Sequence, residues 1–142
     1  MDLNAGNFYR RDGVVNRVAV MGVGAGVEHD TVHGAEAGGV EYARLMILIG
    51  TGEGSDGNTF SIKPNWQENY KLAQALTDAL NAQIPNLCRD VMVKTGRYNQ
   101  HMSPSAVLIE VGHNKNTLQQ AMNSTAPLAC AIAEILQDDN GD

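Results

Sequence analysis

The chain has 142 residues, 43% of them hydrophobic and 18% charged, and a formal net charge of −6. This composition excludes a disordered chain, and the length favours a single domain over residues 1–142. No apolar run approaches the roughly 18 residues of a membrane span. Because the ten Lys and Arg are scattered through an acidic chain, a nucleic-acid partner is not expected either.

The N-terminal third predicts two strands separated by a loop. The first residues lack the basic and then apolar order of a secretory signal, so no targeting segment is predicted. Residues 14–23 have the composition of a strand, and residues 24–39 contain five glycines and predict a loop. Residues 43–50 form a continuous apolar run, which is typical of a central strand covered on both faces.

Two histidines in the glycine-rich loop are weak candidates for a metal site. His29 and His33 are spaced as H-x-x-x-H, with acidic side chains nearby. On a helix this spacing would place both imidazoles on one face, but the segment has no helical periodicity. Two interpretations stay open: a metal site, and a solvated loop.

Residues 64–85 predict the clearest helix in the chain. Asn65 and Glu68 have the spacing of a capping box, and Pro85 ends the run. The apolar stripe that should face the sheet comprises Leu72, Ala73, Leu76, Ala79 or Leu80, and Ile84. Trp66 in the first turn is expected to pack on the sheet, although an aromatic ring there could also stack on a sugar.

The segment 90–112 predicts a hairpin-like unit. A strand over 91–95 is followed by a polar turn over 96–105 and by an apolar strand over 106–111. Glu110 lies in that apolar strand, where a buried polar group without a partner would cost about 2–7 kcal/mol. Glu110 is therefore exposed at a strand end, satisfied by a partner, or kept there for chemistry.

The C-terminal part predicts two helices. Asn116 would cap a short helix over 117–122, with Gln119 returning the bond, and Pro127 suits the first turn of a last helix. The alternation of strands and helices predicts the α/β class. Cys88 and Cys130 are isolated, and their spacing indicates neither a metal site nor a disulfide framework.

Two motifs carry a resemblance to a known family. The segment R-Y-N-Q-H-M-S-P-S-A-V-L-I-E-V-G-H-N-K-N-T-L-Q-Q-A at 97–121 and K-P-N-W-Q-E-N at 63–69 resemble the stage II sporulation protein P family of zinc-dependent N-acetylmuramoyl-L-alanine amidases. The resemblance covers about 42–137. It implies a mostly parallel, twisted sheet with helices on both faces, here lacking the N-terminal part of the fold. It also implies an extracytoplasmic protein that acts on peptidoglycan.

The resemblance assigns roles to a few residues. By position, Glu110 is the catalytic acid and base that cuts the amide between muramic acid and the stem peptide. Arg97 and Asn99 have the charged and amide groups that grip a peptide carboxylate or carbonyl. The alternative at that motif is structural: Tyr98 packs and Asn99 shapes the turn. His113 could line the same end of the sheet as Glu110, or it is an ordinary loop histidine.

Zinc is implied by the resemblance, but the family's ligands are not found in this chain. Where the family has an H-R-D segment, this sequence has Arg10, Arg11 and Asp12, and a guanidinium has no lone pair to give a metal. The chain is then a piece completed by a companion segment, or a divergent copy that uses His29, His33 or His101. The third possibility is a non-catalytic module that binds the cell wall or serves a structural role.

Overall fold

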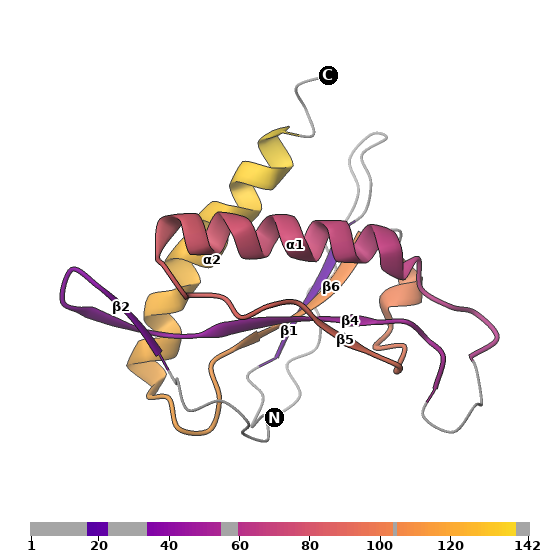
Figure 1. The fold of residues 1–142 in the computed structure, drawn as a ribbon, viewed down its shortest axis with the longest axis horizontal. Coiled ribbons are helices and arrows are strands. Elements are labelled where there is room, and N and C mark those ends of the chain that lie inside the picture. Colours follow the sequence, from indigo (N-terminus) through magenta and orange to yellow (C-terminus); the bar gives the residue numbers. More distant parts are fainter. Residues whose placement is uncertain (1–16, 23–33, 55–59, 104, 139–142) are drawn as a thin grey trace. The chain divides into compact units, whose positions relative to one another are not determined.

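The computed structural model describes residues 17–22 (backbone), 34–54, 60–103 and 105–138. The elements follow in the order β1 (Arg17–Gly22), β2 (Gly34–Ala37), β3 (Val40–Ala43), β4 (Leu45–Gly50), α1 (Trp66–Gln83), β5 (Met92–Lys94), a 3-10 turn (Gln100–Met102), β6 (Ser105–Val111) and α2 (Leu118–Asp138) (Figure 1). The predicted α/β class is confirmed.

Four strands form a mixed sheet in the order β1-β6-β4-β5. β4 and β5 are parallel, with Leu48 opposite Met92. The Gly112 N–H, just after β6, donates to the carbonyl of Arg44, just before β4, at 2.9 Å. The carboxyl end of β6 therefore lies at the amino end of β4. The sheet is thus more mixed than the expected mostly parallel arrangement.

The apolar runs mark the two interior strands. Ile47 and Ile49 of β4 and Ile109 of β6 are fully buried, and β4 and β6 are neighbours in the sheet, as their composition indicates. The hairpin-like pairing of 91–95 with 106–111 is wrong, because β4 lies between β5 and β6. An apolar strand such as β6 buries more of its side-chain surface beside another interior strand than it would beside β5, which is short and mostly exposed.

The end of the predicted glycine-rich loop is a hairpin. β2 and β3 pair antiparallel, with Ala35 opposite Tyr42, and the turn between them is Gly38-Gly39 with φ of 60° and 79°. A Gly-Gly pair that adopts positive φ at both positions is a typical two-residue hairpin turn. The prediction of a loop over 24–39 was therefore wrong for 34–39. The glycines of the hairpin turn were interpreted as part of a flexible loop.

The chain divides into two compact units. The first contains β1, Ile47–Gln74 and Val91–Ile109. The second contains the described residues of Val23–Met46, together with Ala75–Asp90 and Glu110–Asp142. β4, α1 and β6 each run from one unit into the other.

Helix α1 confirms its prediction closely. Its buried residues include Ala73, Leu76 and Leu80, with 0%, 3% and 0% exposure, which are members of the expected stripe. Trp66 in its first turn is half-buried.

In the second unit, Cys88 follows this helix, with its thiol 3.7 Å from the Thr77 hydroxyl. Burial raises the pKa of the Cys88 thiol, and both Cys88 and the exposed Cys130 are free.

Helix α2 is one helix and not the two that the sequence indicated. Pro127 lies inside it, although a proline there cannot donate to the preceding turn. The face that contains Ser124, Leu128 and Ala131 is buried, and this packing outweighs the local preference. The predicted cap is displaced by one residue. Thr117 Oγ1 accepts the Gln120 N–H at 3.1 Å, and Gln120 Oε1 accepts the Thr117 N–H at 3.0 Å.

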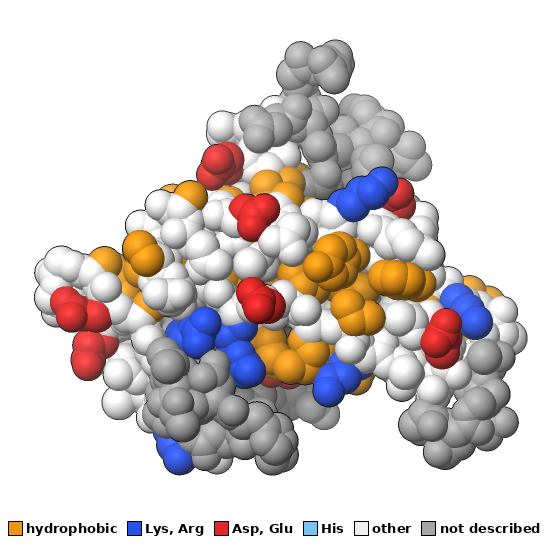
Figure 2. Space-filling view, viewed as in Figure 1, with side chains coloured by type: hydrophobic (Ala, Val, Ile, Leu, Met, Phe, Trp, Pro, Cys, Tyr) orange, Lys and Arg blue, Asp and Glu red, His pale blue; other side chains and the backbone are white. Residues whose placement is uncertain are grey.

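Among the described residues, no helix is both long and apolar enough to cross a membrane. Figure 2 shows acidic and basic side chains interspersed on the visible face, with several apolar side chains reaching the surface.

Replacing Leu76 by Ala tests the packing of α1. Leu76 is 3% exposed, so the cavity left by the substitution should lower the free energy of unfolding by about 2–5 kcal/mol. Urea unfolding followed by circular dichroism measures this loss. Leu118→Ala is the control, since Leu118 is 77% exposed and should change stability by less than about 0.5 kcal/mol. Equal losses in both variants would contradict the assigned core.

Candidate functional site

The residues of the R-Y-N-Q motif form a turn, the 97–100 turn, at the carboxyl ends of β4 and β5. The backbone continues the pairing past the strands: the Thr51 N–H donates to Lys94 O at 2.9 Å, and the Gly52 N–H donates to Gly96 O at 3.1 Å. Ligands in open α/β sheets commonly bind beyond the carboxyl ends of parallel strands. The turn therefore occupies a position suited to recognition.

Gln100 ties this turn to β4. Its Oε1 accepts the Gly50 N–H at 2.8 Å, and its Nε2 donates to the Leu48 carbonyl at 2.8 Å. The side chain is 1% exposed. A single carboxamide thus satisfies a donor and an acceptor of a buried strand, which would each be costly to leave unpaired.

The backbone of the turn is held in an uncommon conformation. Tyr98 and Asn99 have φ of 48° and 56°, a region that side chains other than glycine and asparagine rarely adopt. The Tyr98 ring lies so close to Gly50 and Gly96 that a Cβ at either position would come within 2.7 Å of it. A Cβ at Gly50 would come even closer to the Gly96 carbonyl oxygen, so Gly50 is required by the backbone as well as by the ring, and Gly96 is required by the ring. Such strain is held in place by surrounding contacts and is frequent at functional sites.

Arg97 is half-buried, and its guanidinium lies over the ring of Phe60 at 4.9 Å from the centroid. Stacking on an aromatic face leaves the N–H groups at the edge of the guanidinium available for a carboxylate. Tyr98, its neighbour in the sequence, is 41% exposed as a residue, and Asn99 is exposed. The 97–100 turn thus presents a cation, an aromatic ring and an amide.

Glu110 belongs to the other compact unit. It is half-buried between Ile109 and Val111, which are 0% and 7% exposed. The strand ends one residue later, and the Asn116 side chain accepts the His113 N–H at 2.9 Å in the connection that follows. Glu110 is therefore near the end of β6 and is neither fully buried nor fully exposed.

The candidate residues fall into two groups, each within one compact unit. Arg97 and Asn99 share one turn, beside the carboxyl end of β4. Glu110 and His113 share the second unit, and Gly112, which lies between them in the sequence, donates its N–H to the carbonyl of Arg44, just before β4.

The described residues contain no group of three or more His, Cys, Asp or Glu that could hold a metal ion. His29 and His33 lie outside the described residues. His101 is half-buried in the 3-10 turn. The part of the chain that the structure describes therefore does not fit the zinc centre implied by the family.

The sequence did not single out several residues that build this site. Gln100 is in the R-Y-N-Q motif, yet only the structure shows that its carboxamide bonds to β4. Asn69 ends the K-P-N-W-Q-E-N motif and is fully buried, with its Oδ1 accepting the Ala106 N–H at 2.9 Å where β6 begins. Phe60 gave no signal, because a single aromatic residue in a polar loop fits no pattern.

This arrangement is that of an α/β domain with the 97–100 turn beyond the carboxyl ends of β4 and β5. The family model of stage II sporulation protein P matches residues 11–133, and the chain belongs to this family. The match begins further toward the N-terminus than residue 42, where the resemblance was expected to begin. Stage II sporulation protein P of Bacillus subtilis (strain 168) is 28% identical over 105 residues. These cover 70% of this chain and 24% of that relative, so the chain spans about a quarter of its length. No solved structure matches.

Replacing Gln100 by Leu tests the tie between the turn and β4. The Gly50 N–H and the Leu48 carbonyl would lose their partner, at about 1–3 kcal/mol for each buried group. We expect the free energy of unfolding to fall by about 2–5 kcal/mol, measured by urea unfolding. The control is Gln67→Leu, since Gln67 is exposed on α1. If Gln100→Leu were as stable as the control, the carboxamide would not hold the turn.

Proposed function

We propose that the chain acts on peptidoglycan as an N-acetylmuramoyl-L-alanine amidase-type domain, outside the cytoplasmic membrane, in sporulation. The observation that carries this proposal is Glu110, a half-buried carboxylate near the end of an interior strand, within the L-I-E-V-G motif. Membership of the stage II sporulation protein P family supports it. An amidase-like arrangement, with helices on both faces of the sheet, belongs to the same proposal.

The chemistry required of Glu110 is proton transfer. Hydrolysis adds the oxygen of water to the amide carbonyl and breaks the bond to nitrogen. A carboxylate in this position can take the proton from the water and give it to the leaving nitrogen. Because the described residues do not fit a zinc centre, a hydrolytic chain would need ligands from outside them, including His29 and His33, or from a companion segment.

A second function is favoured by the 97–100 turn: a non-catalytic module that binds the stem peptide of peptidoglycan. The turn is fixed by Gln100 and presents Arg97, stacked on Phe60, at a sheet edge. Recognition of a carboxylate by Arg97 needs no metal. This function and the hydrolase share a ligand and differ in chemistry, so one assay on purified sacculi can separate them.

Replacing Glu110 by Gln tests proton transfer. The substitution keeps the shape of the side chain and removes its ability to carry a proton. Release of stem peptide from purified sacculi, with zinc supplied, should fall by about 10²–10⁴-fold while sacculus binding is retained. Glu134→Gln, at an exposed position of α2, makes the same charge change and should keep full activity.

The same assay distinguishes the two functions. If the wild type releases peptide and Glu110→Gln does so equally, Glu110 is not the proton carrier. If neither releases peptide but both bind sacculi, the chain is the binding module. Elemental analysis after dialysis gives the zinc content, which we expect to be low in the isolated chain. One zinc held per chain, and lost on changing His29 and His33, would instead establish a metal site in that segment.

Replacing Arg97 by Met tests recognition. Met retains an apolar side chain against Phe60 but removes the guanidinium. Because hydrogen bonds to charged groups contribute about 1.5–3 kcal/mol, sacculus binding measured by co-sedimentation should weaken by about tenfold or more. Lys71→Met, on the exposed surface of α1, is the charge-matched control. Equal binding by both variants would remove Arg97 from the recognition surface.

A further inference from the structure

Two aromatic residues, Trp66 and Tyr70, form a row on the first turns of α1, called here the aromatic row. They are four residues apart, so they are neighbours on the helix surface, with about 5–6 Å between their Cβ atoms. Trp66 is half-buried and Tyr70 is 37% exposed, whereas Asn69 and Ala73 beside them are fully buried. Figure 2 shows apolar side chains at the surface over this half of α1. Packing of the helix therefore depends on the neighbouring residues and does not account for the exposed ring of Tyr70.

The ring of Tyr70 is held along the helix. Its hydroxyl donates to Gln74 Oε1 at 3.4 Å, one helical turn further on. The ring therefore extends over the helix surface, with one face toward the helix and the other toward solvent. Because the ring is oriented before any ligand arrives, little conformational freedom is lost when a ligand stacks on it.

The surroundings of the aromatic row are polar and carry no net charge. Glu68 and Lys71, the charged residues of the same turns, form an ion pair with each other at 2.7 Å. Asn65 and Gln67, the neighbours of Trp66 in the sequence, are exposed amides. Aromatic faces beside neutral hydrogen-bonding groups suit a neutral polar ligand better than an ion or a purely apolar molecule.

The aromatic row begins beside the 97–100 turn. A Cβ at Gly52 would lie 2.7 Å from the Cδ of Pro64, so the residues that lead into α1 pack on Gly52. The Gly52 N–H donates to Gly96 O at 3.1 Å, and Gly96 directly precedes Arg97. All of these residues belong to the first unit. The start of α1 and the 97–100 turn therefore lie at the same corner of that unit.

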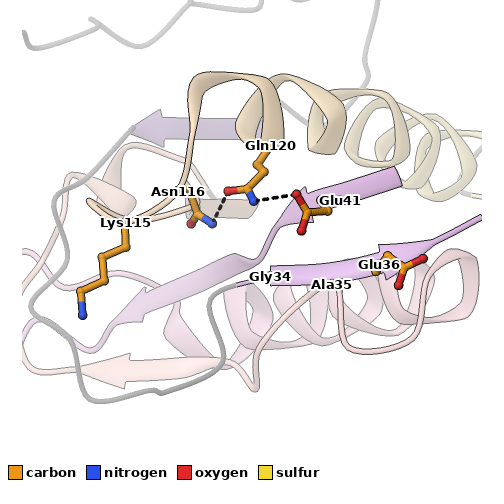
Figure 3. A pocket seen from close by; sticks show the side chains of 7 residues that line it. All are labelled: Gly34, Ala35, Glu36, Glu41, Lys115, Asn116 and Gln120. Carbon is orange, nitrogen blue, oxygen red and sulfur yellow. Dashed lines mark hydrogen bonds between the residues drawn. The ribbon is translucent and has the colours of Figure 1, made fainter. Parts of the chain in front are cut away.

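A groove of about 330 Å³ in the second unit has a different character (Figure 3). Its amides bond within the groove: Asn116 Nδ2 donates to Gln120 Oε1 at 3.1 Å, and Gln120 Nε2 donates to Glu41 Oε2 at 3.5 Å. The described residues that line it include no aromatic side chain. It therefore offers no ring on which a ligand could stack, unlike the aromatic row.

We propose that the aromatic row binds the sugar rings of a glycan by stacking. The C–H groups on one face of a pyranose ring match the negative face of an aromatic ring, and the hydroxyl and N-acetyl groups of the sugar can bond to the amides of Asn65 and Gln67. The choice of the peptidoglycan glycan rests on the proposed function, because the stem peptide assigned to Arg97 is attached to these sugars. The aromatic row thus adds the glycan to the ligand of the first unit.

Titration of the full chain with chitotetraose, an oligomer of N-acetylglucosamine without peptide, tests the proposal. Trp66 is the only tryptophan of the chain, so its fluorescence reports contact with the sugar. The emission should change with a dissociation constant of about millimolar, as expected for a short neutral ligand. Tyr70→Ala should weaken binding by about five- to tenfold, because it removes a stacking face. Tyr70→Phe keeps the ring and should bind within about twofold of the wild type.

Met122→Ala is the control, since Met122 is 55% exposed on α2 in the other unit and should bind as the wild type does. Unchanged thermal unfolding confirms that the variants are folded. The proposal is overturned if Tyr70→Ala binds as tightly as Tyr70→Phe, or if the emission of Trp66 stays constant at about tenfold the expected dissociation constant. It is also overturned if no sugar binds and sedimentation shows a dimer that Tyr70→Ala dissociates, because the aromatic row is then an interface between two copies.

Sugar binding and hydrolysis are measured separately. Chitotetraose has no stem peptide, so its binding does not require Arg97 or Glu110. A chain that binds the oligosaccharide but neither binds sacculi through Arg97 nor releases peptide would overturn the proposed function alone. A chain that releases peptide from sacculi but does not bind the oligosaccharide would overturn this inference alone.

Discussion

The carboxamide of Gln100 is the interaction on which the first unit depends. It is buried, and it satisfies both the Gly50 N–H and the Leu48 carbonyl at the end of β4. A hydrocarbon side chain of the same size would leave both groups unpaired in a buried place. The same carboxamide fixes where the chain must turn before it enters β6. The position of Arg97 and Asn99 follows from that constraint.

The turn holds its shape against a local cost. Tyr98 and Asn99 are in the left-handed region, where a residue other than glycine costs on the order of 1–3 kcal/mol. The contacts that offset this cost are the Gln100 hydrogen bonds and the packing of the Tyr98 ring against Gly50 and Gly96. Side chains at those glycines would displace the ring. A turn that is held in this way fixes the backbone that carries Arg97, whose guanidinium lies over the Phe60 ring.

The sequence predicted what depends on strong periodicity and missed what depends on long-range contacts. The apolar run of β4 correctly predicted an interior strand, and the apolar stripe of α1 correctly predicted a packed helix. In both segments the composition itself indicates burial. The β2–β3 hairpin was missed, since Gly38 and Gly39 indicate a loop and a hairpin turn equally well. Pro127 was misplaced because its own preference opposes a helix interior, whereas Leu128 and Ala131, which the apolar pattern placed on the buried face of the last helix, are buried.

Two residues of the motifs that carry the family resemblance have structural roles. Asn69 ends one motif and accepts the Ala106 N–H where β6 begins, and Gln100 ends the R-Y-N-Q motif and holds β4 where it ends. Both are buried amides that satisfy backbone groups at the ends of the interior strands. Their presence therefore preserves the fold whether or not the chain hydrolyses anything. Arg97 and Glu110 differ from them, because no backbone role accounts for a stacked guanidinium or for a half-buried carboxylate in an apolar strand. The proposed function therefore rests on those two residues and not on the motifs as a whole.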